Sequence, residues 1–365
     1  MKNQPVVGIL TYRNGNRFNE PRLFRDFVKE GQDLGITVFL FAHNDVMPKK
    51  KLIRGFVPVK GGGFEPKLFP WPDVVIDRCR KWSPGFTEMR RKPYFPYTSH
   101  KFTRKWKAME LFASEPSLKK WIPKTKTYSP EAFRSLIGEF PIVYVKPGNG
   151  TGGSGVVRVS RESEGYRIAA RTRSMKTVTV HRFSTQGDVI RWLDRWVNSQ
   201  SIRGCHFMAQ QGLDLALIPD RVSDVRLLIQ KTGQGKWDVT GLALRAGGKN
   251  SPTSNQIFNN GGKVYNFDSF MTERFGRSKA AEIREECEAL GHEIVRVIES
   301  KFGSMLEFGL DLGVDVNGDV WLIEVNPKPA HDTFLKSGDD DIYRKSIRRP
   351  LQYAVHLARS SKRNE

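Results

Sequence analysis

Two carboxylates and an amide stand close together near the C-terminus, in a pattern that predicts a two-stranded hairpin. They are Asp311, Glu324 and Asn326, and the dipeptide Asn317-Gly318 separates the two alternating stretches that carry them. Asn-Gly is typical of a two-residue type I′ turn. With that turn and an unbroken register, Asp311 lies directly opposite Glu324. All three polar groups then share one face, because side chains alternate along a strand.

This polar face is suited to hold a divalent cation. Two carboxylates opposed on paired strands repel each other, which calls for a cation between them unless they are exposed. An oxygen-only set favours Mg²⁺, with Mn²⁺ as the alternative, because Mg²⁺ keeps few protein ligands and adds phosphate oxygens. A solvated acidic face is the other interpretation, and it is the one we expect for Asp315 and Asp319. The opposite face is apolar and predicts a core surface made of Leu310, Leu312, Val314, Trp321, Ile323 and Val325.

A second segment, residues 148–155, has five glycines in eight positions. Such a backbone can turn its N–H groups toward phosphate oxygens. A strand rather than a helix is expected to follow, which argues against a dinucleotide-binding motif, and the sequence lacks the Gly-Lys-Ser/Thr of a Walker A loop and the partner motifs of a kinase. We interpret the segment as a phosphate-binding flap after Lys146; a purely structural hairpin is the alternative. The flap residues expected to contact the phosphates are Gly148, Gly150, Thr151, Gly152, Gly153 and Ser154.

The elements that must position these groups predict an α/β protein. Residues 1–97 resemble a small α/β domain, in which a helix over 21–34 alternates with strands and favours a parallel sheet. Glycines at 61–63 and prolines at 66, 70 and 72 predict an irregular loop in that domain. The strands expected along the chain are 6–10, 36–42, 74–77, 142–146, 156–160, 206–211, 222–231 and 237–245. The further helices are 101–114, 130–137, 188–197, 278–302 and 343–358.

Length, composition and charge limit the number of domains, the location and the partners that we expect for this protein. The chain has 365 residues, which predicts two or three domains. Its mean hydropathy is −0.48, and the longest apolar runs are too short for a membrane span or a secretory leader. Three scattered cysteines and seven dispersed histidines favour a reduced, cytoplasmic location and argue against zinc. The net charge of +21 attracts polyanions, but no nucleic-acid motif accompanies it, so nucleic acid is not expected as the main partner.

Taken in order, these motifs resemble the ATP-grasp superfamily, and specifically its YheC/YheD-like members, which are associated with bacterial endospores. The resemblance covers nearly the whole chain. It rests on an ordered set: Lys105 before Ile-Pro-x-Thr, Val-Lys-Pro at 145–147, the glycine flap, Gln210 to Leu213, Asp224-Val-Arg226, Arg245, and the closing Asp311, Glu324 and Asn326. The resemblance implies an α/β fold, α+β in its ATP-grasp part. A pre-ATP-grasp domain would span 1–97, a first lobe with the flap 98–205, and a second lobe with the hairpin and a C-terminal helix 206–365.

The resemblance also implies a role for each site residue. Lys105 and Lys146 hold the α- and β-phosphates of ATP. The adenine edge is read by the hinge, which consists of Gln210, Gln211, Gly212 and Leu213, and Asp214 reaches the ribose. Arg226 and Arg245 grip the γ-phosphate and the acyl-phosphate. Asp311, Glu324 and Asn326 are the magnesium ligands. The alternatives are a surface charge for Lys105 and a buried ion pair between Asp224 and Arg226.

The implied activity is that of a Mg-dependent, ADP-forming carboxylate–amine or carboxylate–thiol ligase that works through an acyl-phosphate. The carboxylate and the amine are not named by the sequence, although the basic excess suggests an acidic peptide. A non-catalytic, nucleotide-binding, spore-associated assembly protein is the alternative. Two departures stand out: Ile257 takes the place of an asparagine four residues before Gly261-Gly262, and Gln211 replaces a common glutamate.

Overall fold

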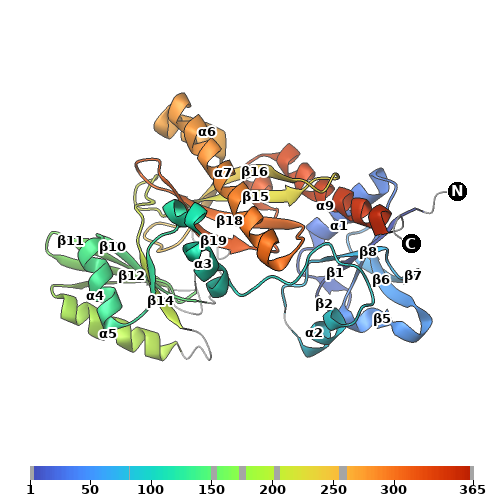
Figure 1. The fold of residues 1–365 in the computed structure, drawn as a ribbon, viewed down its shortest axis with the longest axis horizontal. Helices are drawn as coiled ribbons and strands as arrows, with labels where there is room; N and C mark the ends of the chain where they lie inside the picture. The colour runs from blue at the N-terminus through green and yellow to red at the C-terminus, as the bar shows by residue number, and fades with distance from the viewer. Residues whose placement is uncertain are drawn as a thin grey trace.

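A computed structural model describes residues 4–81, 83–148, 154–171, 178–200, 206–254 and 261–361. The described part contains three large sheets that follow one another along the chain (Figure 1). The sheet nearest the two termini lies at one end of the molecule and the second sheet at the other end, with the third between them. The fold is therefore of the mixed α/β class that the sequence predicts. None of the described helices is both long enough and apolar enough to span a bilayer.

The first sheet has the strand order β5-β6-β4-β1-β8, with β7 paired to β6. β1 (Val6–Leu10) runs parallel to both β4 (Thr37–Phe41) and β8 (Val74–Asp77), as the alternation of strand and helix predicts. The other strands are β5 (Val46–Met47), β6 (Leu52–Pro58) and β7 (Phe64–Pro70), and a small separate hairpin consists of β2 (Arg13–Asn14) and β3 (Arg17–Phe18). The helices of this part are α1 (Pro21–Asp33) and α2 (Pro84–Arg91), with short 3-10 turns at His43–Asp45 and Pro48–Lys50.

The irregular loop predicted around residues 61–72 is wrong, because this segment forms much of an antiparallel hairpin. Pro66 pairs with Phe56 and Pro70 with Leu52 along the β6–β7 ladder. Proline lacks the N–H that an inner strand must donate, but β7 is an edge strand that pairs only with β6. The first sheet is therefore mixed rather than wholly parallel.

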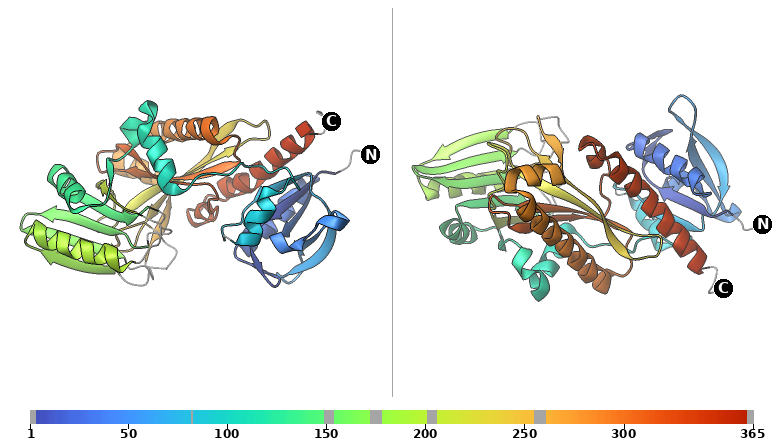
Figure 2. Two further views of the ribbon diagram at one scale, coloured as in Figure 1. Left: turned by 60° about the horizontal axis from the view of Figure 1, so that its bottom comes forward. Right: turned by 90° about the horizontal axis from the view of Figure 1, so that it is seen from above.

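The second sheet is antiparallel throughout and has the order β13-β12-β11-β10-β14-β9. Its strands are β9 (Thr125–Thr127), β10 (Ile142–Pro147), β11 (Val157–Glu162), β12 (Gly165–Arg171), β13 (Val178–Phe183) and β14 (Phe207–Gln211). Helices α4 (Pro130–Glu139) and α5 (Gln186–Ser199) cover one face (Figure 2). Val143 and Val145 point into that core, so Tyr144 and Lys146, which alternate with them, point to the opposite face.

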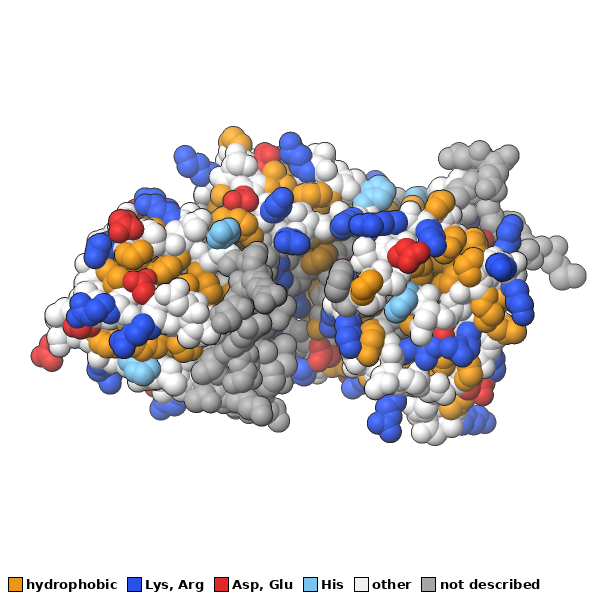
Figure 3. All heavy atoms as spheres, turned by 90° about the horizontal axis from the view of Figure 1, so that it is seen from below, with side chains coloured by type: hydrophobic (Ala, Val, Ile, Leu, Met, Phe, Trp, Pro, Cys, Tyr) orange, Lys and Arg blue, Asp and Glu red, His pale blue; other side chains and the backbone are white. Residues whose placement is uncertain are grey.

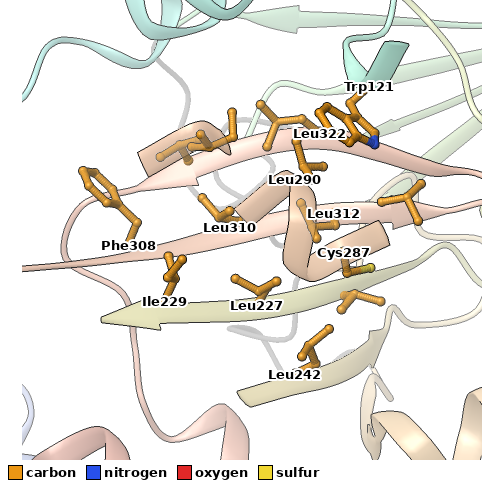
Figure 4. Close-up of a cluster of buried hydrophobic side chains, with 14 of the residues drawn as sticks. Trp121, Leu227, Ile229, Leu242, Cys287, Leu290, Phe308, Leu310, Leu312 and Leu322 are labelled. Carbon is orange, nitrogen blue, oxygen red and sulfur yellow. The ribbon is translucent and has the colours of Figure 1, made fainter. Parts of the chain in front are cut away.

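The third sheet has the order β17-β16-β15-β18-β19 and is also antiparallel. Its strands are β15 (Ser223–Lys231), β16 (Trp237–Ala246), β17 (Lys263–Asn266), β18 (Glu307–Val314) and β19 (Val320–Asn326). The associated helices are α3 (Lys105–Ser114), α6 (Phe267–Phe275), α7 (Arg277–Phe302), α8 (Thr333–Lys336) and α9 (Asp340–Ser361), with a 3-10 turn at Pro116–Trp121. Leu227, Leu310 and Leu312 of the sheet pack on Cys287 and Leu290 of α7 (Figure 4). The other face meets α9 and the first sheet through Leu228 and Ala243.

The hairpin between β18 and β19 has a different turn from the one predicted. Gly318 alone of the loop takes a positive φ, of 87°, whereas a type I′ turn requires the same of Asn317. The N–H of Gly318 donates to the carbonyl oxygen of Asp315 at 2.9 Å. The carboxylate of Asp315 accepts from the N–H groups of Asn317 and Asp319 at 2.9 and 3.1 Å, which stabilises a three-residue loop. The prediction that Asp315 is solvated is therefore wrong, since it is only 9% exposed; Asp319 is exposed as predicted.

A bulge in β19 restores the register that the longer loop displaces. Leu312 pairs with Leu322, one residue short of the predicted alignment, but after the irregularity Asp311 faces Glu324. The bulge also changes which side chains are buried, so the apolar face is wrong at two positions. Val320 and Leu322 join the core, whereas Trp321 and Ile323 do not. The side chain of Ile323 lies instead beside Gly313, on the face that carries Asp311.

We expect a stability difference between two glycine substitutions in the part of the chain that forms the second sheet. Gly165 has φ of 124°, and a Cβ there would overlap the carbonyl oxygen of Phe183. Gly165→Ala should therefore lower the free energy of unfolding by about 1–3 kcal/mol. Gly138 is an exposed position of helix α4 with open space around it, so Gly138→Ala should raise that free energy by about 0.5–1 kcal/mol. Thermal and urea unfolding would measure both; equal effects would contradict this account.

Candidate nucleotide and metal site

A cluster of buried charges lies on one face of the third sheet. Asp311 on β18 accepts a hydrogen bond from Arg226 Nε on the neighbouring strand at 2.8 Å, and Arg245 Nη2 lies 3.1 Å from the same Oδ1 atom. The side chains of Arg226, Arg245 and Asp311 are 8, 16 and 13% exposed. Alternation along the strands sends Val225, Leu227 and Leu310 to the opposite, apolar face, so the core positions all three charges.

Arg245 is held more tightly by a second carboxylate. Its Nε and Nη2 atoms donate to the two oxygens of Asp224, each at 2.6 Å, and Ser254 also donates to that carboxylate. The expected alternative of an ion pair between Asp224 and Arg226 is therefore wrong: Asp224 pairs with Arg245, and Arg226 pairs with Asp311. Asp224 and Arg226 are two positions apart on β15, so their side chains lie on the same face. Asp224 pairs with a residue of β16 and Arg226 with a residue of β18.

These ion pairs decide the protonation of the cluster. Burial by itself would raise the pKa of Asp311, but Arg226 and Arg245 outweigh burial and lower that pKa to about 2. Burial would likewise lower the pKa of Arg245, but Asp224 and Asp311 raise it above its ordinary value. Asp311 is therefore an anion and Arg245 a cation at neutral pH. Charged groups buried in this way need such pairing, because an isolated buried charge is very costly.

The three predicted metal ligands lie together. Asp311 is opposite Glu324, and Asn326 Nδ2 approaches Asp311 Oδ2 at 3.4 Å. Lys105 forms an ion pair with Oε1 of Glu324. Side chains from β15, β16 and α3 supply positive charge to this opposed carboxylate pair, and the metal assignment stays a prediction.

The remaining oxygen atoms still fit a hard divalent cation. Among the described residues, Asp311 Oδ2 receives only the long Asn326 contact, and Glu324 Oε2 and Asn326 Oδ1 receive no side-chain hydrogen bond. No cluster of three or more His, Cys, Asp and Glu side chains suited to a metal occurs in the same described ranges. Two carboxylates and one amide fit Mg²⁺ because this ion keeps several positions for phosphate or water oxygens.

Lys105 occupies the first position of helix α3, which begins four residues later than predicted. A cation at a helix N-terminus is unfavourable, and no side chain caps this end. The ion pair with Glu324 offsets that cost by joining α3 to β19. Lys105 is therefore not the isolated surface charge that was the alternative: its side chain is 30% exposed and has a partner.

Lys146 reaches the same region from the second sheet. Its Nζ donates to Gln210 Oε1 at 2.6 Å, and Gln210 in turn donates to Thr125 Oγ1 at 2.7 Å. Burial lowers the pKa of Lys146 to about 8, while Glu324 raises it and Lys105 lowers it further. Those two influences come from the third sheet and from α3. The second and third sheets therefore present their polar faces to a common space.

The hinge residues connect the two sheets. Gln211 ends β14, and its side chain accepts from the N–H of Lys124 at 3.1 Å. Gly212 donates to the carbonyl of Ile142 at 2.7 Å, and a side chain at this position would overlap Ile142. Leu213 is buried beside Gly313. The carbonyl of Asp214 accepts from Val316 at 3.1 Å, which ties the hinge to the hairpin loop.

Part of the predicted flap lies outside the described residues. Gly148 is described: its N–H donates to the carbonyl of His206 at 2.9 Å, and a Cβ there would lie 3.5 Å from Trp106 Cβ on α3. Ser154 is described and half-buried. Gly150, Thr151, Gly152 and Gly153 are not described. Ile257, which stands where the family pattern has an asparagine, is not described either. The molecule is hollowed near its middle, and lysine and arginine side chains border the hollow (Figure 3).

Sequence reasoning missed the contribution of the first sheet. Arg78, which follows β8 and is 2% exposed, donates to the carbonyl of Pro329 at 2.8 Å and to Glu307 Oε1 at 2.7 Å. Arg80 Nε donates to the carbonyl of Lys328 at 3.0 Å. Both arginines therefore hold the loop that directly follows Asn326. The available signal was an Arg-Cys-Arg sequence at the carboxyl end of a parallel strand, where α/β proteins gather functional groups.

Known proteins resemble this chain over most of its length. The sequence model of the YheC/D like ATP-grasp family matches residues 94–357. The endospore coat-associated protein YheD of Bacillus subtilis (strain 168) is 28% identical over 376 residues, which cover 97% of this chain and 79% of the relative. The endospore coat-associated protein YheC of the same organism is 21% identical over 337 residues, covering 90% of each chain.

Solved structures share the fold at low sequence identity. D-alanyl-alanine synthetase A from Vibrio cholerae O1 biovar eltor str. N16961 has a TM-score of 0.53 at 10% identity and covers 99% of both chains. D-cycloserine synthetase DcsG has a TM-score of 0.54 at 12% identity, with 97% of this chain and 99% of that chain covered. VanG D-Ala:D-Ser ligase from Enterococcus faecalis has a TM-score of 0.54 at 11% identity, with 98% of this chain and 100% of that chain covered. With this fold, and with the family model matched over residues 94–357, the chain belongs to the YheC/D-like ATP-grasp family.

Proposed function

We propose that this chain binds Mg-ATP between the second and third sheets and uses it to activate a substrate carboxylate. The observation that carries the proposal is the ion pair of Lys105 with Glu324, with Lys146 under the electrostatic influence of both, beside the buried pairing of Arg226 with Asp311. Lysines from two elements beside unshared carboxylate oxygens are complementary to a triphosphate with a divalent ion. The proposed units are residues 1–97, a first lobe over 98–205 and a second lobe over 206–365.

Each group has a role in the proposed complex. Lys105 and Lys146 contact the α- and β-phosphates, and the glycine flap from Gly148 to Gly155 closes over them. Backbone groups of Gln210 to Leu213 bind the adenine edge, and Asp214 faces the ribose. Mg²⁺, held by Asp311, Glu324 and Asn326 with Mn²⁺ as a substitute, would neutralise charge on the phosphates.

The proposed reaction has two steps. An oxygen of the substrate carboxylate attacks the γ-phosphorus, the bond to the β,γ-bridging oxygen breaks, and ADP leaves with the electron pair. An amine or a thiol then attacks the acyl carbon of the acyl-phosphate and displaces inorganic phosphate. Arg226 and Arg245 offset the charge of the transferred phosphoryl group, and their ion pairs with Asp311 and Asp224 fix their guanidinium planes in advance. Phosphoryl transfer depends mainly on such positioning and charge stabilisation.

Several relatives bear names that agree with this reaction class. The solved structures with the same fold include a D-alanyl-alanine synthetase and a D-Ala:D-Ser ligase. The net charge of +21 favours an acidic substrate such as a glutamate-rich peptide. The second candidate is a nucleotide-binding assembly protein without catalysis, because the curated relatives are named endospore coat-associated proteins. Both candidates would use the same lysines and carboxylates to bind the nucleotide, so substrate-dependent release of ADP is the property that separates them.

We expect loss of magnesium-dependent ATP binding when two of the metal ligands are removed together. Glu324→Ala with Asn326→Ala deletes one carboxylate and one amide from the oxygen set. Calorimetric titration of ATP with and without Mg²⁺ measures the change. Asp319→Ala is the matched control, because it removes one exposed carboxylate from the same hairpin. Mg-dependent binding that persists in the double variant would refute the metal assignment.

ATP affinity should fall as pH rises through about 8. Burial lowers the pKa of Lys146 to about 8, so the free protein loses this cation above that pH. ATP binds the protonated form better and raises its pKa, so binding at higher pH must take up a proton. The dissociation constant should increase by up to about tenfold per pH unit above 8. Titrations in two buffers with different ionisation enthalpies measure the proton uptake. The Lys146→Met variant should bind ATP more weakly and lose this proton uptake. Proton uptake that is unchanged in the variant would assign the uptake to another group.

An acyl-phosphate should be trapped by hydroxylamine as a hydroxamate. The substrate is first sought as the amino acid or acidic peptide that stimulates ADP and phosphate release. Arg226→Met should lower kcat by about 10²–10³, the usual effect of removing one transition-state donor. Arg226→Lys keeps the positive charge beside Asp311 and should lower kcat less than Arg226→Met does. Nucleotide binding without substrate-dependent ADP release would favour the assembly role.

A further inference from the structure

A groove of about 630 Å³ lies at the end of strands β15 and β16 that is opposite to the charge cluster. Its walls are helix α9, the turn Thr232 to Gln234 between β15 and β16, and residues 34 and 36 after helix α1. Helix α9 runs between the third sheet and the first sheet (Figure 2, right). The turn is about 20 Å along β15 from Arg226, at ~3.4 Å per residue. The groove is therefore separate from the proposed ATP cleft.

The polar lining of the groove is basic. Arg349, Gln352, His356 and Arg359 recur at three- and four-residue intervals and so share one face of α9. Two arginines and a histidine line the groove, and none of its lining residues is Asp or Glu. Within the described ranges, the side chains of Gln352 and Arg359 receive no hydrogen-bond or ion-pair partner. A helix face that leaves a cation and an amide unpaired, beside a concave wall, is suited to an anion.

We propose that this groove binds a small organic dianion, a dicarboxylate or a phosphate monoester. Arg359 supplies the free cation at the rim, and Gln352 supplies amide donors. Leu34, Ile36 and Val355 form an apolar wall that accommodates a short carbon skeleton between the charged groups. The volume lies within the range of ordinary small-molecule sites.

Arg349 connects the groove to a continuous buried hydrogen-bond chain. Arg349 Nη1 donates to Thr240 Oγ1 at 2.8 Å, and Thr240 donates to Gln230 Oε1 at 2.7 Å. Gln230 Nε2 donates to Glu307 Oε2 at 2.7 Å, and Glu307 Oε1 accepts from Arg78 at 2.7 Å. Arg349 is also anchored by the carboxylate of Asp238, so its guanidinium group is held at the floor of the groove.

The far end of this chain lies beside the proposed metal site. Arg78 donates to the carbonyl of Pro329, three residues after Asn326. His331, 1% exposed, lies 3.0 Å from the same Glu307 carboxylate through Nε2. Burial would raise the pKa of Glu307, but His331 and Arg78 outweigh burial and lower it to about 2. An anion that draws Arg349 outward would disturb this chain, so occupancy of the groove should change the affinity for Mg-ATP.

Two probes test the binding part: succinate as the dicarboxylate and glycerol 3-phosphate as the phosphate monoester. Calorimetric titration into the full-length protein without nucleotide should show saturable binding, in the millimolar range or tighter, for at least one of them. Arg359→Glu should weaken that binding at least tenfold. Arg344→Glu makes the same charge change at an exposed position of α9 outside the groove and should change it less than twofold. No saturable binding to the wild type, or equal losses in both variants, overturns the site.

The coupling part is tested with the probe that binds. The dissociation constant for Mg-ATP, measured with and without saturating probe, should change at least threefold in the wild type. Thr240→Val interrupts the chain between Arg349 and Gln230 and should abolish that change while the probe still binds. An unchanged Mg-ATP affinity in the presence of bound probe overturns the coupling. Failure of Mg-ATP itself to bind would instead count against the proposed function, because probe binding is measured independently.

Discussion

The pairing of Asp311 with two arginines is the interaction on which the rest of the site depends. A carboxylate with 13% exposure is stable as an anion only if cations meet it; Arg226 comes from the adjacent strand β15, and Arg245 comes from β16, the next strand beyond. This requirement fixes the register of three adjacent strands, since a slip of one residue would bury one charge without its partner. The same pairing leaves Asp311 Oδ2 for other ligands. Structural stability and the proposed chemistry therefore rest on the same few atoms.

Around this cluster, three parts of the chain meet that are far apart in the sequence. Lys146 comes from the second sheet, Lys105 from the start of α3, and Arg78 from the end of β8. The lowered pKa of Lys146 indicates a cation that lacks enough negative charge nearby, because burial outweighs the attraction of Glu324. In the proposed complex, a triphosphate would supply that missing charge. The fold around these groups is that of the YheC/D-like ATP-grasp family.

The hairpin shows how a sequence pattern can predict the correct pairing through an incorrect turn. The Asn-Gly dipeptide predicted a two-residue loop, but the carboxylate of Asp315 binds the loop N–H groups and stabilises a three-residue loop instead. A bulge near Ile323 then compensates for the extra residue, so Asp311 still faces Glu324. Leu322 packs into the core in place of Ile323 for the same reason. Similarly, prolines suggested a loop where an edge strand tolerates them, because edge position is a property of the whole sheet.

The sequence by itself determined the order of the motifs, the α/β class, most helix and strand positions, and the common face of Asp311, Glu324 and Asn326. These follow from side-chain periodicity and from local turn signals, which are written in neighbouring residues. Only the tertiary structure decided that Asp224 pairs with Arg245, that Lys105 meets Glu324, and that Arg78 holds the loop after Asn326. Each of these contacts joins two different elements of the fold: two strands, a helix and a strand, or a strand end and a distant loop. Their partners are selected by packing and by the need to neutralise buried charge across the whole fold, and no local pattern records that selection.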